Sequence, residues 1–318
     1  MKARALILGV LALTGACKKS GGGGGGGGGT TWLVGASGMM LRIGTDGALA
    51  GYSAPSSENL NAIACRYGGE AWVAGAHGTL LYTADGGRSW AVQPVPTRAE
   101  LRAVATQDLG PVYLAGDGVV LRSTDTGAHW TQLADGARRF RSIAAAQHAD
   151  TVIAVADDGG LWAVEDRADG PALVAGAQLA GARAVAVSPD GQTVVVAGDA
   201  LLARSADAGH TFTRLDAPAG VRFDDVRIDD AGAAIAVGSA GAIARIGADG
   251  AVAVHRVGNA DLHTLHIAEP GEDGDARGFA GGEGGAVWIT DDGGASWHAG
   301  PDAGQTVLGL DQIGDGHR

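Results

Sequence analysis

Short apolar runs recur along most of the chain, and many of them alternate between apolar and small or polar residues. Ala184-Val-Ala-Val and Thr193-Val-Val-Val-Ala are two examples. A period of two is typical of β-strands, and the body of the chain shows no periodicity of an amphipathic helix. The pattern therefore predicts an all-β fold.

The predicted strands belong to a repeated unit. In each unit a strand that ends in a small residue, usually Val/Ala-Gly, is followed by a tight turn and a second strand. A period near 41 residues fits four short strands, which is the size of a propeller blade. We therefore predict a seven-bladed β-propeller of four-stranded blades over residues 31–318. The seven marker positions lie 40 to 43 residues apart: Gly35, Gly75, Gly116, Asp157, Gly198, Gly238 and Gly281.

The third unit illustrates the four strands, which we name a to d from the inside of the ring outward: 101–106, 112–116, 119–123 and 130–133. The first unit has no strand a in front of Trp32, and 306–313 has the pattern of a strand a with no unit after it. We expect this C-terminal strand to pair with the first blade and close the ring, because closure leaves no open sheet edge around the circle.

The turn between strands c and d carries the motif Ser/Thr-x-Asp-x-Gly-x-x-aromatic. The Asp can accept hydrogen bonds from N–H groups two residues on, and the hydroxyl can close the same turn. The Gly allows a positive φ, and the aromatic residue can bury apolar surface against a neighbouring unit. Every position therefore has a structural role. Four units hold the complete motif: Thr83, Asp85, Gly87, Trp90; Ser123, Asp125, Gly127, Trp130; Ser205, Asp207, Gly209, Phe212; and Thr290, Asp292, Gly294, Trp297.

This motif resembles the Asp-box, or BNR repeat, of sialidases and other propellers. The longer unit 73–90 is most similar to the photosystem II assembly and stability factor-like family. That resemblance implies a seven-bladed propeller that acts as an assembly scaffold. The basic patch that those factors carry for their partner has no obvious equivalent in this acidic sequence.

The first thirty residues have the features of a targeting segment rather than of a folded domain. A basic start and the apolar run 5–13 precede small residues and Cys17, which resembles the lipobox of bacterial lipoproteins. The resemblance implies a signal peptide over 1–16 and lipid on Cys17. Lys18 and Lys19 favour the outer membrane, on its periplasmic or cell-surface side, and 17–30 would form a polyglycine tether. An ordinary secretory leader with an incidental cysteine is the alternative. No later stretch is apolar enough to span a bilayer, so we expect anchoring through lipid alone.

Charge and cysteine content narrow the classes of function. The chain has 35 acidic and 23 basic residues and a net charge of −12, which argues against nucleic-acid binding. Cys17 and Cys65 are the two cysteines, so acylation of Cys17 would leave no disulfide within the chain. We expect Cys65, in an apolar run, to be a small buried hydrophobe.

Nothing in the sequence selects a catalytic or metal site. The Arg-Ile/Leu-Pro motif of sialidases is absent, and no carboxylate pair stands out for glycoside hydrolysis. His263 and His266 lie in one predicted strand and should face opposite sides, so they should not share a metal. We expect solvated loops rather than Ca²⁺ sites at the acidic segments 224–225, 229–230 and 272–275. The sequence thus predicts no enzyme activity, no cofactor and no metal.

In a propeller, the turns between strands b and c lie on the same face as the d–a connections. Propellers usually bind their ligands or partners on this face. We hypothesise that the residues of these b–c turns form an acidic rim that binds a cation or a basic partner. The alternative is that the same residues serve only to form the turns. The predicted function is a monomeric, lipid-anchored scaffold for protein interaction or assembly in the bacterial envelope, with an unidentified envelope protein as partner. A carbohydrate-active or ligand-binding propeller, similar to glycosidases, is the alternative. The rim residues are His77, Asp117, Asp157, Asp158, Asp199 and Glu283.

Overall fold

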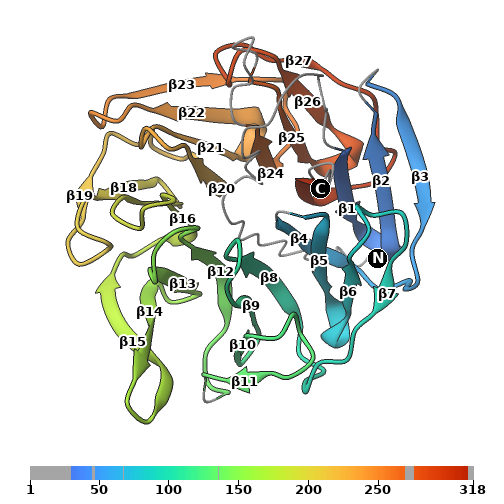
Figure 1. Cartoon of the computed structure of the whole chain (residues 1–318). Helices are drawn as coiled ribbons and strands as arrows, with labels where there is room; N and C mark the ends of the chain where they lie inside the picture. Colours follow the sequence, from blue (N-terminus) through green and yellow to red (C-terminus); the bar gives the residue numbers. More distant parts are fainter. Residues whose placement is uncertain (1–29, 45–46, 67, 135, 269–275, 314–318) are drawn as a thin grey trace, which may run out of the picture.

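The computed structural model describes residues 30–44, 47–66, 68–134, 136–268 and 276–313. In this part the chain forms seven four-stranded antiparallel sheets that stand around a central channel like the blades of a propeller (Figure 1). The four helical segments are single 3-10 turns. The predicted all-β, seven-bladed fold is confirmed. The expected leader, lipidated Cys17 and tether precede Thr30 and lie outside the described residues.

The blades are numbered along the chain, and their strands are given from the inside outward. Blade 1 holds β28 (Val307–Ile313), β1 (Thr30–Gly35), β2 (Met39–Ile43) and β3 (Leu49–Ser53). Blade 2 holds β4 (Leu60–Arg66), β5 (Glu70–Gly75), β6 (Leu80–Thr83) and β7 (Ala91–Val92). Blade 3 holds β8 (Leu101–Thr106), β9 (Val112–Gly116), β10 (Val119–Ser123) and β11 (Thr131–Gln132). Blade 4 holds β12 (Phe140–Ala145), β13 (Val152–Ala156), β14 (Gly160–Arg167) and β15 (Gly170–Gln178).

The remaining blades follow the same order. Blade 5 holds β16 (Ala182–Val187), β17 (Val194–Gly198), β18 (Leu201–Ser205) and β19 (Thr213–Arg214). Blade 6 holds β20 (Phe223–Ile228), β21 (Ala234–Gly238), β22 (Ala242–Ile246) and β23 (Val252–Arg256). Blade 7 holds β24 (Leu262–Ile267), β25 (Gly278–Gly282), β26 (Val287–Thr290) and β27 (His298–Ala299). The 3-10 turns are η1 (Ala36–Gly38), η2 (Ala76–Gly78), η3 (Ser239–Gly241) and η4 (Glu283–Gly285).

The ring is closed by the last strand, as the sequence predicts. β28 pairs antiparallel with β1, from Thr30 opposite Ile313 to Gly35 opposite Val307. β28 also contacts β4 and β24, the inner strands of the two neighbouring blades. Blade 1 is therefore built from both ends of the described chain, and every inner strand has a neighbour on each side.

The core is divided among the seven interfaces between successive blades. Each interface holds one cluster of buried apolar side chains, and the side chains of one strand alternate between the two interfaces that it borders. Small residues such as Ala103 and Ala105 pack near the channel, where the blades converge. Cys65 is buried in the cluster between blades 1 and 2, in agreement with its expected role.

The Ser/Thr-x-Asp turn has the same geometry in all four blades that carry it. In blade 2, the Thr83 hydroxyl donates to Asp85 Oδ1 at 2.7 Å and accepts from Gly87 N–H at 3.1 Å. Asp85 accepts from the Ser89 N–H, four residues on, at 2.9 Å, so the expected bond from two residues on is wrong. Burial alone would raise the pKa of Asp85, but the hydrogen bonds from Ser89 and Thr83 lower it to about 2.

The turn also joins each blade to the preceding one. Trp90 is buried, and its ring meets that of Trp32 in blade 1 edge to face, with 5.4 Å between centroids. Gly87 has φ = 80°, and a Cβ there would overlap the Trp32 indole. Trp297 packs in the same way in the interface with blade 6, near Ile235. The motif is thus a clamp between blades. Blade 4, which lacks it, has a long β14–β15 hairpin in that place.

A recurring glycine at the end of strand b has a steric cause. In blade 2, the residue after Gly75 donates its N–H to the Asn59 carbonyl at 2.9 Å, and a Cβ on Gly75 would overlap that oxygen. The strand register identifies Ala156 and Gly282 as the equivalent positions in blades 4 and 7. The sequence markers Asp157 and Gly281 were therefore each wrong by one residue.

This close approach predicts that Gly75→Ala destabilises the fold by about 1–3 kcal/mol, the usual cost of overpacking. Gly51→Ala is the matched control, because a Cβ on Gly51 meets no atom within 4 Å. Urea unfolding of both variants measures the effect. Equal losses of stability in the two variants would contradict the steric explanation.

Closure by β28 predicts that deletion of residues 304–318 lowers the melting temperature far more than deletion of Gly21–Gly29. The first deletion removes the inner strand of blade 1 and exposes the edge of β1. Differential scanning calorimetry of the two truncated proteins tests this. Equal melting temperatures would exclude a closing role for the C-terminal strand.

Candidate functional site

All six rim residues lie on b–c turns, as expected. His77 is in η2 and Glu283 in η4, and the four aspartates lie in the b–c turns of blades 3, 4 and 5. These turns share one face with the d–a connections, since Asp117 N–H bonds the Glu100 carbonyl and Asp199 N–H bonds the Gly181 carbonyl. We call this end of the channel the mouth.

A second ring of polar residues lies just inside the mouth, and the sequence reasoning missed it. It consists of the second residue of the inner strand in blades 2 to 7, and we call it the collar. The recurrence of Arg at this position in three successive units is visible in the sequence and was the available signal. The collar residues are Asn61, Arg102, Arg141, Arg183, Asp224 and His263.

The collar arginines neutralise part of the rim. Arg102 donates to both carboxylate oxygens of Asp117, from Nε at 2.7 Å and from Nη2 at 3.2 Å. Burial lowers the pKa of the Arg102 guanidinium, but Asp117 outweighs this effect and the net shift is upward. Arg141 Nε lies 2.5 Å from Asp157 Oδ1. Asp117 and Asp157 are therefore internal counter-ions of the collar.

Asp224 and Asp225 are buried strand residues, so the expectation of a solvated loop was wrong for this pair. Asp224 is 3% exposed and accepts from the Nε atoms of Arg183 and Arg222, each at 2.9 Å. Burial raises the pKa of Asp224, but His263 and the two arginines lower it overall. Because Asp224 lies in the inner strand β20, its carboxylate meets the arginines of the channel and not solvent. Asp229 and Asp230 do lie on an exposed turn, as expected.

Besides Asp157, three further rim carboxylates are exposed to solvent. Asp158, Asp199 and Glu283 are exposed, and we call them the mouth carboxylates. Asp199 is 58% exposed and lies 3.8 Å from Arg183. Asp158 Oδ1 accepts the Gly160 N–H at 2.9 Å, which fixes the turn. Their charge is therefore available to a partner.

His77 also lies on the mouth face, and its ring is exposed to solvent. His77 Nδ1 lies 2.8 Å from Glu58 Oε2, and this hydrogen bond and the Glu58 charge raise the pKa of His77. When protonated, His77 forms an ion pair with Glu58. The charge of a protonated His77 would be balanced by Glu58, so this position adds no net charge to the rim.

His263 and His266 point to different partners, as the strand alternation predicts. His263 Nδ1 lies 3.7 Å from Asp224 Oδ2 at the mouth. His266 lies deeper, with Nδ1 2.8 Å from Asp311 Oδ1. Among the described residues, no group of three or more His, Cys, Asp or Glu side chains has the geometry of a metal site. The acidic segment 272–275 lies outside them.

The channel edge of the inner strands is capped by side chains of adjacent blades. An inner strand pairs with only one sheet neighbour, so its other edge presents unpaired backbone groups. Asp311 Oδ2 accepts the Cys65 N–H at 2.8 Å, and Asp225 Oδ2 accepts the Leu265 N–H at 2.9 Å. Ser142 Oγ accepts the Val185 N–H at 3.1 Å. Buried polar residues in the channel therefore hold neighbouring blades together.

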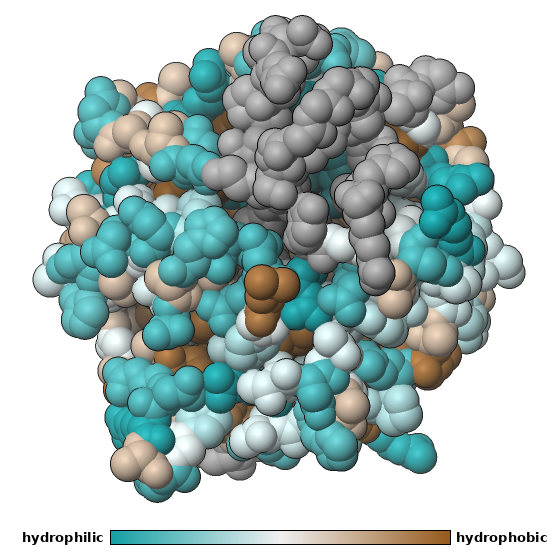
Figure 2. Space-filling model, in the orientation of Figure 1, coloured by the Kyte–Doolittle hydropathy of each residue, from teal (hydrophilic) through white to brown (hydrophobic). Residues whose placement is uncertain are grey.

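Large exposed apolar residues are few on the described surface. In the described chain Val92, Leu109 and Val254 are the exposed large apolar residues, and they are far apart in sequence. Figure 2 shows one face of the disc, on which hydrophilic residues predominate and apolar ones are scattered. The described segments contain no helix with the length and hydropathy needed to cross a bilayer. Charge, rather than an apolar patch, distinguishes the mouth.

Solved propellers share this fold at low sequence identity. A structure of YCF48 bound to D1 peptide is 17% identical, with a TM-score of 0.60, and the match covers 77% of this chain and 81% of that one. YCF48 from Cyanidioschyzon merolae is 16% identical, with a TM-score of 0.61 and coverages of 82% and 95%. A streptogramin B lyase is 13% identical, with a TM-score of 0.62 and coverages of 83% and 88%.

These similarities establish the fold. No family model matches the chain, and no curated protein matches it. The chain is a propeller that resembles YCF48 in structure. Its neighbours include a peptide-binding protein and an enzyme, so the fold alone does not decide the function.

Buried Asp225 predicts a pH dependence of stability. Burial raises its pKa to about 7, although Arg227 and two backbone N–H groups oppose this. At pH values between 3.8, the ordinary pKa of an aspartate, and about 7, the pKa of Asp225 in the folded state, the folded protein binds more protons than the unfolded protein. Stability from this group therefore falls as pH rises from 5 to 8, by at most about 1.4 kcal/mol per pH unit.

Asp225→Asn should flatten this dependence, because the amide oxygen can still accept a backbone N–H and does not titrate. Urea unfolding between pH 5 and pH 8 measures it. Asp229→Asn, on an exposed turn, is the control and should follow the wild-type protein. Parallel pH profiles for Asp225→Asn and the wild-type protein would contradict the assignment.

Proposed function

We propose that this protein is a non-enzymatic scaffold for protein interaction or assembly in the bacterial envelope, and that it binds a basic segment of its partner at the channel mouth. The observation that carries the proposal is the set of mouth carboxylates Asp158, Asp199 and Glu283. They project from short turns in three blades around one opening. A structurally similar propeller binds a peptide.

The electrostatics of the mouth favour a basic partner segment. The collar pairs its buried arginines with Asp117 and Asp157, and the mouth carboxylates stay exposed; the same face also presents Arg139, which lies 3.9 Å from Asp117. The whole chain carries a net charge of −12. Complementary charge accelerates encounter and selects the partner more than it raises affinity. Binding should accordingly weaken as ionic strength rises.

The envelope location rests on the N-terminal sequence. The small residues before Cys17 resemble a lipobox, and Lys18 and Lys19 favour the outer membrane. Lipid on Cys17 and the polyglycine that follows it would hold the propeller near the membrane while leaving its faces accessible. In this proposal the propeller is monomeric and the lipid is its single membrane contact.

A ligand-binding or carbohydrate-active propeller is the second candidate. Three neighbouring collar arginines could receive an anionic sugar, and burial together with the charge of Arg183 lowers the pKa of Arg141. Against this, Arg102, Arg141 and Arg183 already bond protein carboxylates. An incoming anion would have to displace these partners, so the protein segment is the better-supported ligand.

The test replaces the mouth carboxylates together, as Asp158→Asn, Asp199→Asn and Glu283→Gln. Cross-linking in the native envelope, followed by recovery of the propeller, should yield about tenfold less of its principal captured protein. Asp117 and Asp157 are left intact, because their replacement would unpair buried arginines and confound binding with folding.

The control replaces three exposed aspartates on turns of the opposite face, as Asp169→Asn, Asp229→Asn and Asp249→Asn. It carries the same change in net charge and should capture the partner like the wild-type protein. If both triple variants capture the partner equally well, the mouth is not the binding site.

A further inference from the structure

The outer strands of the blades differ widely in length. In the four blades that carry the complete c–d motif the outer strand has two residues, whereas β15 of blade 4 has nine, Gly170–Gln178. β15 is the last strand of its sheet and pairs with β14 alone. In Figure 1 it lies at the rim of the disc, with no described strand outside it. Blade 4 therefore ends in a long open edge.

The register determines which backbone groups point outward along this edge. β14 and β15 are joined by the two-residue turn 168–169, and their pairing is continuous from this turn to Ala175. The residues that flank such a turn form a hydrogen-bonded pair, and bonded pairs alternate with non-bonded pairs along an antiparallel ladder. Pro171, Leu173 and Ala175 therefore occupy non-bonded positions, with their backbone groups directed away from β14. The outward donors are the N–H groups of Leu173 and Ala175, because Pro171 has none.

Little along β15 prevents another strand from pairing with it. Proteins commonly protect edge strands by short length, charged side chains, proline or bulges. Residues 170–178 include no charged side chain, and the proline and the register shift stand near the two ends, outside 172–175. Among the described residues, the backbone of 171–178 makes hydrogen bonds to no strand other than β14. The donors of Leu173 and Ala175 are therefore open to a partner.

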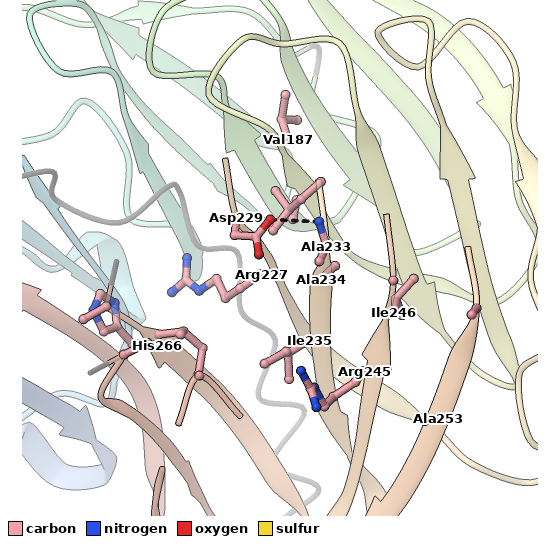
Figure 3. Close-up of a pocket in the computed structure, with 18 residues that line it drawn as sticks. Val187, Arg227, Asp229, Ala233, Ala234, Ile235, Arg245, Ile246, Ala253 and His266 are labelled. Carbon is pink, nitrogen blue, oxygen red and sulfur yellow. Dashed lines mark hydrogen bonds between the residues drawn. The ribbon is translucent and has the colours of Figure 1, made fainter. Parts of the chain in front are cut away.

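Blade 6 also lacks the complete motif, but its outer strand β23 is better protected. β23 has five residues and ends in His255 and Arg256, and the Arg256 guanidinium donates to two carbonyls of η3 at 2.7 and 3.0 Å. Ala253, in the middle of β23, lines an apolar cavity of about 370 Å³ (Figure 3). β15 is longer than β23 and carries no such charge.

The charges at the ends of β15 indicate which kind of segment can pair with it. At the mouth end, Asp158 is exposed, and its carbonyl accepts from Gln178 Nε2 at 2.6 Å, so this mouth carboxylate lies beside the end of β15. The hairpin tip at the other end has both signs of charge, Arg167 and Asp169. Charge complementarity therefore favours a basic residue next to Asp158 and an uncharged stretch along the strand.

We propose that the outer edge of β15 binds an extended segment of the protein partner by β-strand addition. The added strand is antiparallel and uncharged, and basic residues precede it so that they lie at Asp158. An antiparallel strand begins where β15 ends, and antiparallel pairing is slightly more stable than parallel pairing. Main-chain hydrogen bonds to Leu173 and Ala175 supply affinity for the segment. This site rests on the proposed function in one respect, because its basic residues are the ones bound at the mouth.

The probe is a synthetic peptide of two lysines followed by alternating threonine and valine, titrated into the full chain by isothermal calorimetry. The expected result is saturable binding of one peptide per chain. A peptide with N-methyl groups on two adjacent central residues, which blocks both of its edges, should bind at least about tenfold more weakly. Absence of saturable binding, or equal binding of the N-methylated peptide, would overturn the proposal. Self-association of the free chain through this edge, measured by analytical ultracentrifugation, would overturn it too, because the occupant would then be a second copy.

Ala175→Pro locates the site, because it removes one outward N–H without removing a bond to β14. The variant should bind the lysine peptide at least about tenfold more weakly, whereas Ala175→Val keeps the N–H and should bind like the wild-type protein. If Ala175→Pro does not fold, hydrogen exchange of the wild-type chain replaces it, and the peptide should slow exchange of the Leu173 and Ala175 amides. Unchanged affinity in the variant, or unchanged exchange at these amides, would overturn the proposal.

A second peptide separates the edge from the mouth. With serines in place of the two lysines, the peptide should bind the wild-type chain more weakly and should lose its remaining affinity in Ala175→Pro. Equal binding of the serine and lysine peptides, both sensitive to Ala175→Pro, would contradict the role of the mouth and support strand addition. Binding of the lysine peptide that Ala175→Pro leaves unchanged, but that is lost in the triple variant of the mouth carboxylates, would support the mouth and overturn strand addition.

Discussion

The pairing of β28 with β1 is the interaction on which the rest of the molecule depends. It supplies the missing inner strand of blade 1 and gives β4 and β24 a neighbour between them. The same strand carries Asp311 into the channel, where this residue caps the Cys65 N–H and orients His266. Closure therefore completes the ring of sheets and also part of its polar interior.

The sequence predicted the fold well because the relevant signals are local. Strands β8, β9 and β10 begin and end where the apolar pattern and the turn residues place them. The outer strand β11 is shorter than expected, Thr131–Gln132 within 130–133. Two-residue outer strands occur in the four blades with the complete c–d motif, whereas the outer strands of the other three blades have five to nine residues. The closing strand was predictable because the first unit lacks an inner strand and the last residues have its pattern.

The candidate site was predictable only in part. Residues of b–c turns could be placed on one face by counting strands, but their charge partners depend on tertiary register. Arg102 and Asp117 are 15 residues apart in sequence, and Arg102 lies at a shift in the register between β8 and β9 that the sequence does not reveal. Asp224 and Asp225 look like a surface pair by composition, whereas the strand around them buries both and Arg183 stabilises Asp224.

The mouth of the channel carries fixed charges, whereas the channel interior holds buried polar residues that cap the inner strands. Both depend on a closed ring. Hydrogen–deuterium exchange of the intact chain, read by mass spectrometry, tests closure most directly. The amides of 307–313 should exchange as slowly as those of the inner strand 101–106. Exchange of 307–313 at the rate of an unprotected chain end would contradict the account.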